Sequence, residues 1–233
     1  MKLLAIDTAT EALSVALWHD GEVTSHFEVI GRGHAERILP LVDRLLAEAG
    51  WTLGSLDALA FGRGPGAFTG VRIAVSTAQG LAYGSGLPVV PVSNLAAVGL
   101  RLLDLARGAD HALACLDARM GEIYAAVAAP RGDGGVDLLV ERLMRPSDFD
   151  AGLLPGEGGI VAGGHGFAAY PALASVLAAR IVATHADCLP RAEEIARLAA
   201  IEVAGGRVVD PERAEPIYLR DDVATKAGTR PRM

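Results

Sequence analysis

The stretch FGRGPGAFTGVRIAVSTAQGLAYGSG, residues 61–86, holds seven glycines and begins like a loop that could cradle phosphate. A Walker A loop ends in Gly-Lys-Ser/Thr, because its lysine neutralises the β- and γ-phosphates. Here Gly70 is followed by valine and arginine. A dinucleotide fingerprint needs G-x-G-x-x-G, and this loop has the longer spacing G-x-G-x-x-x-G. Neither type of nucleotide-binding loop fits.

The region around this loop lacks the side chains that usually do chemistry. Between Ala58 and Leu103 there is no Asp, Glu, His, Cys or Lys. General acid–base catalysis, metal binding and covalent catalysis mostly depend on these residue types. We therefore expect no catalytic residue and no metal site in this region.

The helix expected after the loop carries a ridge of small residues. They recur every four positions, so they share one helix face. Such a ridge either packs closely against the chain's own sheet or docks on a helix of another subunit. We predict the second, with an interface formed by Gly70, Arg72, Ala74, Ala78 and Ala82.

The remaining elements are expected to form an α/β fold with two lobes. Short apolar runs predict strands, and apolar periodicity predicts helices. The strands are expected at 2–7, 13–19, 22–29, 56–62, 87–93, 111–118, 121–130, 136–144 and 160–166, and further helices at 34–50, 94–108, 168–180 and 191–206. The order βββαβαβα of the first half is that of a ribonuclease-H-like unit, and the second half begins in the same way. We predict one lobe at 1–106 and a related, glycine-rich lobe at 107–233.

Composition restricts the function classes. The 233 residues are 51% hydrophobic and 21% charged, as in globular proteins, and the net charge of −7 argues against unaided binding to nucleic acid. Cys115 and Cys188 lack C-x-x-C spacing and are expected to be buried free thiols. Asp7 and Glu11 interrupt the apolar start, and no apolar stretch reaches membrane-spanning length. These features favour a cytoplasmic protein.

Several segments together resemble the TsaB (YeaZ) family over essentially the whole chain. They are LLAIDTATEALSVAL, GHAERILPLV, the glycine-loop run with its G-P-G-x-F-T-G-x-R-I pattern, PVVPVSNLAAV, DARMGEIYAAV and EPIYLRDDVA. The resemblance implies an actin/Hsp70/sugar-kinase-like fold with mixed sheets flanked by helices. It also implies a bacterial subunit of the machinery that makes threonylcarbamoyladenosine beside the tRNA anticodon. In that machinery the paralogue TsaD transfers the threonylcarbamoyl group, and TsaE is an ATPase.

The same resemblance argues against catalysis by this chain. TsaD carries an H-x-x-x-H metal motif, and the matching positions here are Asn94 and Val98. Asparagine is a weak ligand for a transition metal and valine is none. We therefore expect no bound metal and no cofactor.

The turn at residues 7–10, after the first expected strand, corresponds to the phosphate-binding Asp-x-Gly-Thr/Ser hairpin that kinases of this fold have. Its candidate nucleotide contacts are Asp7, Thr8 and Thr10, but Ala9 stands in place of the glycine. The alternative, which we favour, is that Asp7 accepts hydrogen bonds from its own turn.

We predict a non-catalytic scaffold that binds TsaD and TsaE, reaches tRNA only through the complex, and forms a homodimer alone. The alternatives are an independent enzyme of this fold, either a small-molecule kinase or a glycoprotease-like metallopeptidase, and a homodimeric binding protein with no link to tRNA.

Overall fold

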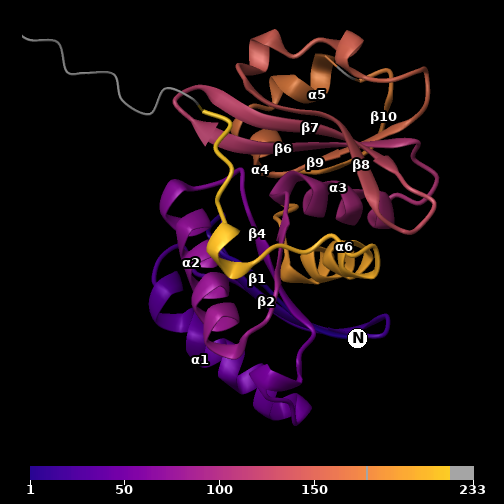
Figure 1. Ribbon diagram of the computed structural model, residues 1–233. Coiled ribbons are helices and arrows are strands. Elements are labelled where there is room, and N and C mark those ends of the chain that lie inside the picture. Colours follow the sequence, from indigo (N-terminus) through magenta and orange to yellow (C-terminus); the bar gives the residue numbers. More distant parts are fainter. Residues whose placement is uncertain (177, 221–233) are drawn as a thin grey trace, which may run out of the picture.

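Two five-stranded mixed sheets form the two lobes of the molecule (Figure 1). The computed structural model describes residues 1–176 and 178–220. The first sheet contains β1 (Lys2–Asp7), β2 (Ala12–His19), β3 (Glu22–Val29), β4 (Ala58–Gly62) and β5 (Val89–Val92). The second contains β6 (His111–Arg119), β7 (Glu122–Pro130), β8 (Val136–Met144), β9 (Ile160–Gly163) and β10 (Ile181–His185).

The two sheets share one topology. The first has the order β3-β2-β1-β4-β5, and the second has the equivalent order β8-β7-β6-β9-β10. In each sheet the first three strands are antiparallel, and the first, fourth and fifth are parallel. The predicted two-lobed actin/Hsp70/sugar-kinase-like fold class is confirmed.

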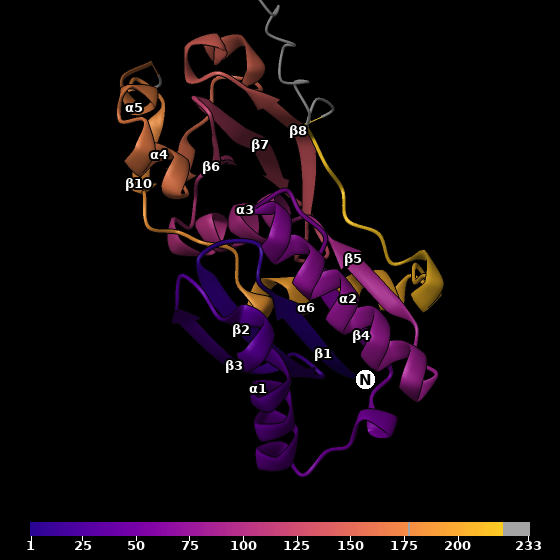
Figure 2. The same ribbon diagram turned by 90° about the vertical axis from the view of Figure 1, so that its left-hand side faces the viewer.

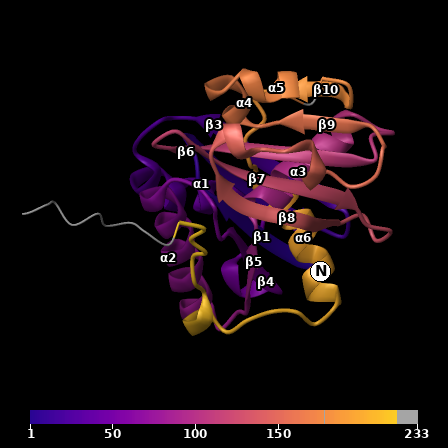
Figure 3. The ribbon, with the colours of Figure 1, turned by 90° about the horizontal axis from the view of Figure 1, so that it is seen from above.

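Helices cover both faces of each sheet, which gives alternating layers (Figure 2). The helices α1 (His34–Ala49) and α2 (Phe68–Ser85) cover the outer face of the first sheet. The short helices α4 (His165–Ala169) and α5 (Ala172–Val176) lie on the outer face of the second (Figure 3). Between the sheets lie α3 (Asn94–Leu105) and α6 (Ala192–Ala204). The 3-10 turns are η1 (Leu53–Ser55), η2 (Pro146–Asp148), η3 (Ala151–Leu153) and η4 (Pro211–Arg213).

Each of the two middle helices packs on the sheet that the other half of the chain forms. The helix α3 follows the first sheet in sequence but packs on β6, β7, β8 and β9 of the second sheet. The helix α6 follows the second sheet but packs on all five strands of the first. The last helix of the predicted lobe at 107–233 therefore packs in space on the first sheet. An apolar sheet needs cover on both faces, and the exchange supplies it for both lobes.

Local sequence signals explain the clearest boundaries. Asp20 and Gly21 have φ angles of +49° and +98°, as a two-residue hairpin between β2 and β3 requires. Gly50 ends α1 in the left-handed conformation, with φ of +66°. Both features follow from the local backbone preferences of these residues.

The second lobe departs from the sequence prediction between residues 168 and 180. The predicted single helix is divided into α4 and α5, and the strand β10, which we did not predict, follows. Pro171 explains the division, because a residue before proline is disfavoured in the helical region and Tyr170 is non-helical. The strand β10 is short and only half-buried, so its apolar signal is weak.

Both cysteines are free and buried, as predicted. Burial raises the pKa of Cys188 to about 11, and it raises the pKa of Cys115 further. Neither thiol is therefore a nucleophile at neutral pH. In the part of the chain that the structure describes, no helix has the length and apolar content that crossing a bilayer requires.

Candidate functional site

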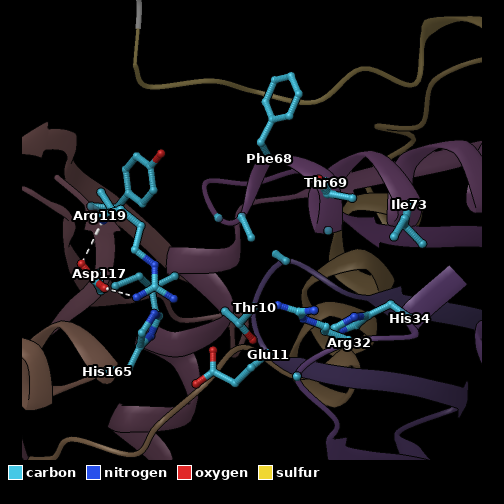
Figure 4. Close-up of a pocket in the computed structure, with 18 of the residues that line it drawn as sticks. Thr10, Glu11, Arg32, His34, Phe68, Thr69, Ile73, Asp117, Arg119 and His165 are labelled. Atoms are coloured by element: carbon cyan, nitrogen blue, oxygen red, sulfur yellow. Dashed lines mark hydrogen bonds and ion pairs between the residues drawn. The ribbon is translucent and has the colours of Figure 1, made fainter. Parts of the chain in front are cut away.

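A cleft of about 730 Å³ lies between the two lobes (Figure 4). One wall consists of the β1–β2 turn, the β3–α1 loop and the first turn of α2. The other consists of the β6–β7 turn and the start of α4, and Tyr218 and Arg220 join the lining from the C-terminal segment. The cleft is therefore built by loops at corresponding ends of the two sheets.

The lining carries charges of both signs. It includes Glu11, Glu36, Asp117, Arg32, Arg119, Arg220, His34 and His165. Because the lining combines acidic and basic side chains, the cleft does not present the single positive field that attracts a nucleic-acid backbone.

The carboxylate that ends β1 is enclosed in the protein. Asp7 is fully buried; Asn94 Nδ2 donates to its Oδ1 (2.5 Å) and the Ala9 N–H to its Oδ2 (3.4 Å). The Gly64 N–H in turn donates to Asn94 Oδ1 (2.7 Å). Burial raises the pKa of Asp7 to about 7, against the opposing effect of these hydrogen bonds. Asp7 is thus satisfied mainly by Asn94 and by its own turn.

The other two candidate nucleotide contacts behave differently from each other. The Thr8 hydroxyl is buried and donates to the Gly70 carbonyl (2.7 Å). Thr10 lines the cleft, and its hydroxyl accepts from the Ala12 N–H (3.3 Å). Of the three residues singled out from the sequence, only Thr10 is placed where a ligand in the cleft could touch it.

The glycines of the loop after β4 permit close packing of backbone on backbone. A Cβ at Gly70 would overlap the Thr8 carbonyl oxygen, and one at Gly66 would overlap that of Ala9. The Ala67 N–H donates to the same Ala9 carbonyl (2.7 Å). The glycine-rich loop therefore fits the start of α2 closely against the β1–β2 turn.

The predicted docking ridge is corrected by the structure. Gly70, Ala74, Ala78 and Ala82 are buried, and α2 packs through this face on β4 and β1. The alternative that the sequence left open, packing on the chain's own sheet, is the one observed. Small side chains that would allow a close approach to a partner helix instead bring α2 close to its own sheet.

Arg72 lies on the opposite, exposed face of α2. Its Nε donates to the Tyr218 hydroxyl (2.7 Å), and its guanidinium lies 3.7 Å from the centre of the Phe68 ring. Ser76 and Gly80 are exposed on the same helix, and a Cβ at Gly80 would meet no atom within 4 Å. The exposed face of α2 therefore combines small residues at Ser76 and Gly80 with the large side chain of Arg72.

The two positions that correspond to the paralogue's metal motif have other roles here. Val98 is buried in the core between the sheets, and the Asn94 amide is engaged by Asp7 and Gly64. Within residues 1–176 and 178–220, no three His, Cys, Asp or Glu side chains lie together as metal ligands would. The local geometry at Asn94 is that of a structural hydrogen-bond network.

The second wall contains polar residues that our sequence analysis did not single out (Figure 4). Asp117 accepts from Arg119 through its backbone N–H (2.9 Å) and its Nη1 (3.1 Å). The Tyr170 hydroxyl also donates to Asp117 (3.4 Å). Burial lowers the pKa of His165, against the opposing charges of Glu11 and Asp117. At neutral pH this wall therefore holds a neutral histidine beside a paired carboxylate.

A signal for this wall was present in the sequence. Asp117 lies near the end of β6, and Asp7 ends β1, the equivalent strand of the first sheet. Because the two halves repeat the same order of strands, the acidic residue near the end of β6 could have been compared with Asp7 and singled out. Arg220 had no comparable signal, because its place in the cleft depends on how the C-terminal segment folds back.

Comparison with known proteins identifies the family. Residues 26–227 match a family model described as TsaD: tRNA N6-adenosine threonylcarbamoyltransferase. The tRNA threonylcarbamoyladenosine biosynthesis protein TsaB of Escherichia coli (strain K12) is 42% identical over 228 residues, which are 97% of this chain and 97% of that protein. The protein of the same name from Haemophilus influenzae is 39% identical over 234 residues, 97% and 96% of the two chains. The chain belongs to the TsaB family.

A solved structure agrees with this assignment. The structure described as YeaZ from Pseudomonas aeruginosa matches with a TM-score of 0.83 and 42% sequence identity, covering 94% of this chain and 99% of that one. The resemblance to the TsaB (YeaZ) family is confirmed, and the enclosed Asp7–Asn94 pair is a feature of this TsaB family member.

Proposed function

We propose that the chain is a non-catalytic scaffold subunit of the bacterial machinery that forms threonylcarbamoyladenosine beside the tRNA anticodon. It binds a TsaD-like catalytic paralogue and a TsaE-like ATPase, and it meets tRNA only as part of the complex. Family membership supports the pathway, since the relatives in Escherichia coli and Haemophilus influenzae are named for this biosynthesis.

The scaffold role is supported mainly by the residues at the positions of the paralogue's metal motif, because their side chains are engaged inside the protein. Asn94 holds the carboxylate of Asp7 instead of a metal, and Val98 is part of the central core. A carboxylate with no exposed surface cannot reach a substrate in the cleft. The net charge of −7 supports a partner that supplies the contacts to tRNA.

The exposed face of α2 is the partner surface in this proposal. Its members are small or interface-prone residues, namely Thr69, Arg72, Ser76, Gly80 and Tyr83. Small side chains allow a second helix to approach to the short end of the usual interaxial range, while Tyr and Arg are typical of interface hot spots. The same face serves self-association, so a homodimer and a heterodimer with the TsaD-like paralogue compete for it.

The test is the mass of the complex formed on mixing this chain with a TsaD-like paralogue, by native mass spectrometry or light scattering. A Ser76→Arg substitution should weaken both the homodimer and the heterodimer. A Ser147→Arg substitution, at an exposed site of the second lobe, is the matched control and should leave both unchanged. No heterodimer with the unaltered chain, or unchanged assembly of the Ser76→Arg variant, would contradict the proposed surface.

The enzymatic alternative is tested on the isolated chain. We expect no ATP turnover and no tRNA modification above background. ATP turnover that is lost in an Asp7→Ala variant, which remains folded, would favour the kinase-like alternative. A heterodimer that forms but does not affect threonylcarbamoyl transfer would favour a binding protein outside this pathway.

A further inference from the structure

The last described segment of the chain, residues 207–220, runs along the first lobe and ends on the second (Figure 1, yellow). Val209 pairs with Val89 through two backbone hydrogen bonds of 2.9 Å. Further on, the Ile217 N–H donates to the Arg63 carbonyl (2.8 Å). Ala214 is buried in the core beneath α2. The segment is therefore fixed to the first lobe up to residue 217.

Tyr218 connects the segment to the exposed first turn of α2. Its hydroxyl accepts from Arg72 Nε (2.7 Å), and its ring centre lies 5.6 Å from that of Phe68. The Arg72 guanidinium is 3.7 Å from the Phe68 ring centre and 5.7 Å from that of Tyr218. These three side chains form a stacked cluster, each of them exposed at the surface.

Two residues later, Arg220 holds the β6–β7 turn of the second lobe. Its Nη2 donates to the Ala118 carbonyl (3.0 Å) and lies 2.7 Å from Glu122 Oε2. Its Nη1 lies 3.5 Å from the sulfur of Met120. The Arg220 and Glu122 side chains are only 19% and 27% exposed, so this ion pair is less screened than a surface pair.

The turn that Arg220 holds is strained. Arg119 and Met120 have φ angles of +63° and +57°, a region that side chains other than Gly, Asn and Asp rarely adopt. The strand register also shifts between Asp117 and Arg119. Such a conformation persists only where surrounding contacts enforce it. The contacts of Arg220 lie on both sides of the strained residues.

We propose that residues 215–220 act as a latch that couples the exposed first turn of α2 to the β6–β7 turn in the cleft. Tyr218 and Arg220 are two residues apart, so the chain between them spans at most about 7 Å. A connection this short cannot absorb a separation of the lobes while both anchors remain in place. A change at the Phe68–Arg72–Tyr218 cluster is therefore transmitted to Asp117 and Arg119.

The latch belongs to the chain itself and does not depend on the proposed function. It predicts that substitutions on α2 loosen a turn that they do not touch. The test is hydrogen–deuterium exchange of the full isolated chain, read on peptides covering residues 116–123. Arg220→Ala should raise exchange in these peptides about tenfold, because it removes the charge-assisted bonds to the turn.

Tyr218→Ala and Arg72→Ala should each raise exchange in the same peptides several-fold, although neither residue contacts the turn. Tyr218→Phe, which keeps the ring stacking and loses the hydrogen bond, should have a smaller effect than Tyr218→Ala. Arg44→Ala is the control, since it removes an exposed arginine that pairs with Glu48 on α1.

Two outcomes would overturn the latch. One is unchanged exchange at residues 116–123 in Arg220→Ala. The other is unchanged exchange there in both Tyr218→Ala and Arg72→Ala, which would show two independent local contacts. If Arg220→Ala fails to fold, Arg220→Lys keeps the charge and loses the two-sided geometry, and it should still raise exchange at the turn but not in α1.

Discussion

The first turns of the two lobes occupy equivalent places in equivalent sheets, yet they are built in different ways. The β1–β2 turn is sealed: Asp7 and Thr8 are fully buried, and glycines of the following loop pack directly on it. The β6–β7 turn is open: Met120 is 84% exposed, and its backbone is strained. Equivalent topology therefore places a turn at the cleft but does not decide whether its polar groups face the cleft or the core.

The helices on the outer faces of the two sheets also differ, in their lengths. On the outer face of the first sheet lie α1 and α2, of 16 and 18 residues, whereas the second sheet is covered there by two helices of five residues each. The long helix α2 can press its glycine-lined start onto the β1–β2 turn. The second lobe instead relies on Arg220, from the C-terminal segment, to hold its turn.

The largest effect should come from breaking the seal of the first turn. Gly70→Ala places a Cβ against the Thr8 carbonyl oxygen, where backbone must move. We expect a loss of about 4 kcal/mol or more in the free energy of unfolding, measured with urea. Gly80→Ala, in open space on the same helix, is the control and should gain up to about 1 kcal/mol. Equal stabilities of the two variants would contradict the role assigned to the glycine loop.

The enclosed carboxylate should make stability depend on pH. The pKa of Asp7 is about 7 in the folded protein against an ordinary 3.8, so the folded state binds this proton more tightly than the unfolded chain. Its stabilising contribution is complete below pH 3.8 and is lost as the pH rises through 7. We therefore expect the free energy of unfolding to fall by roughly 3 kcal/mol when the pH is raised from 5 to 8, because this contribution is lost.

Asp7→Asn should remove this part of the pH dependence, because the amide has no charge at either pH. Asp43→Asn, at an exposed position on α1, should leave the dependence as it is. The measurement is urea unfolding of all three proteins at both pH values. The same slope in Asp7→Asn and in the unaltered chain would show that Asp7 is not the titrating group.

The inner face of α2 should tolerate less added volume than its outer face. Ala78→Leu overpacks the interface with the first sheet and should cost about 2 kcal/mol of stability. Ser76→Leu, on the exposed face, should change stability by less than about 0.5 kcal/mol. Thermal unfolding of both variants distinguishes the two faces. An Ala78→Leu variant as stable as the unaltered chain would contradict the burial of the small-residue face of α2.

The smallest effect concerns the strained turn. Met120→Asn places a residue that accepts the left-handed conformation at an exposed position, and should stabilise the chain by about 0.5 to 1 kcal/mol. Leu139→Asn, an exposed leucine on β8 outside the turn, should give no gain. If both variants lose stability equally, strain in the β6–β7 turn is not what distinguishes the two lobes.

Several particular elements were predictable because their signals are local. The hairpin at Asp20–Gly21 and the end of α1 at Gly50 follow from the backbone preferences of those residues. The order of elements along the first half was predictable from its short apolar runs and its helical apolar periodicity. The boundaries failed where the signals were weak, as at β10, or where a proline divided an apolar run, as at Pro171.

The sequence by itself determined the element order of the first half, the family, and the small-residue face of α2. Only the tertiary structure decided which way that face points, because burial against a sheet and burial against a partner select the same small residues. It also decided that α3 and α6 exchange lobes, and that Asn94 meets Asp7 across 87 positions of the chain. Such contacts join distant segments through packing, and no local preference of either residue encodes them.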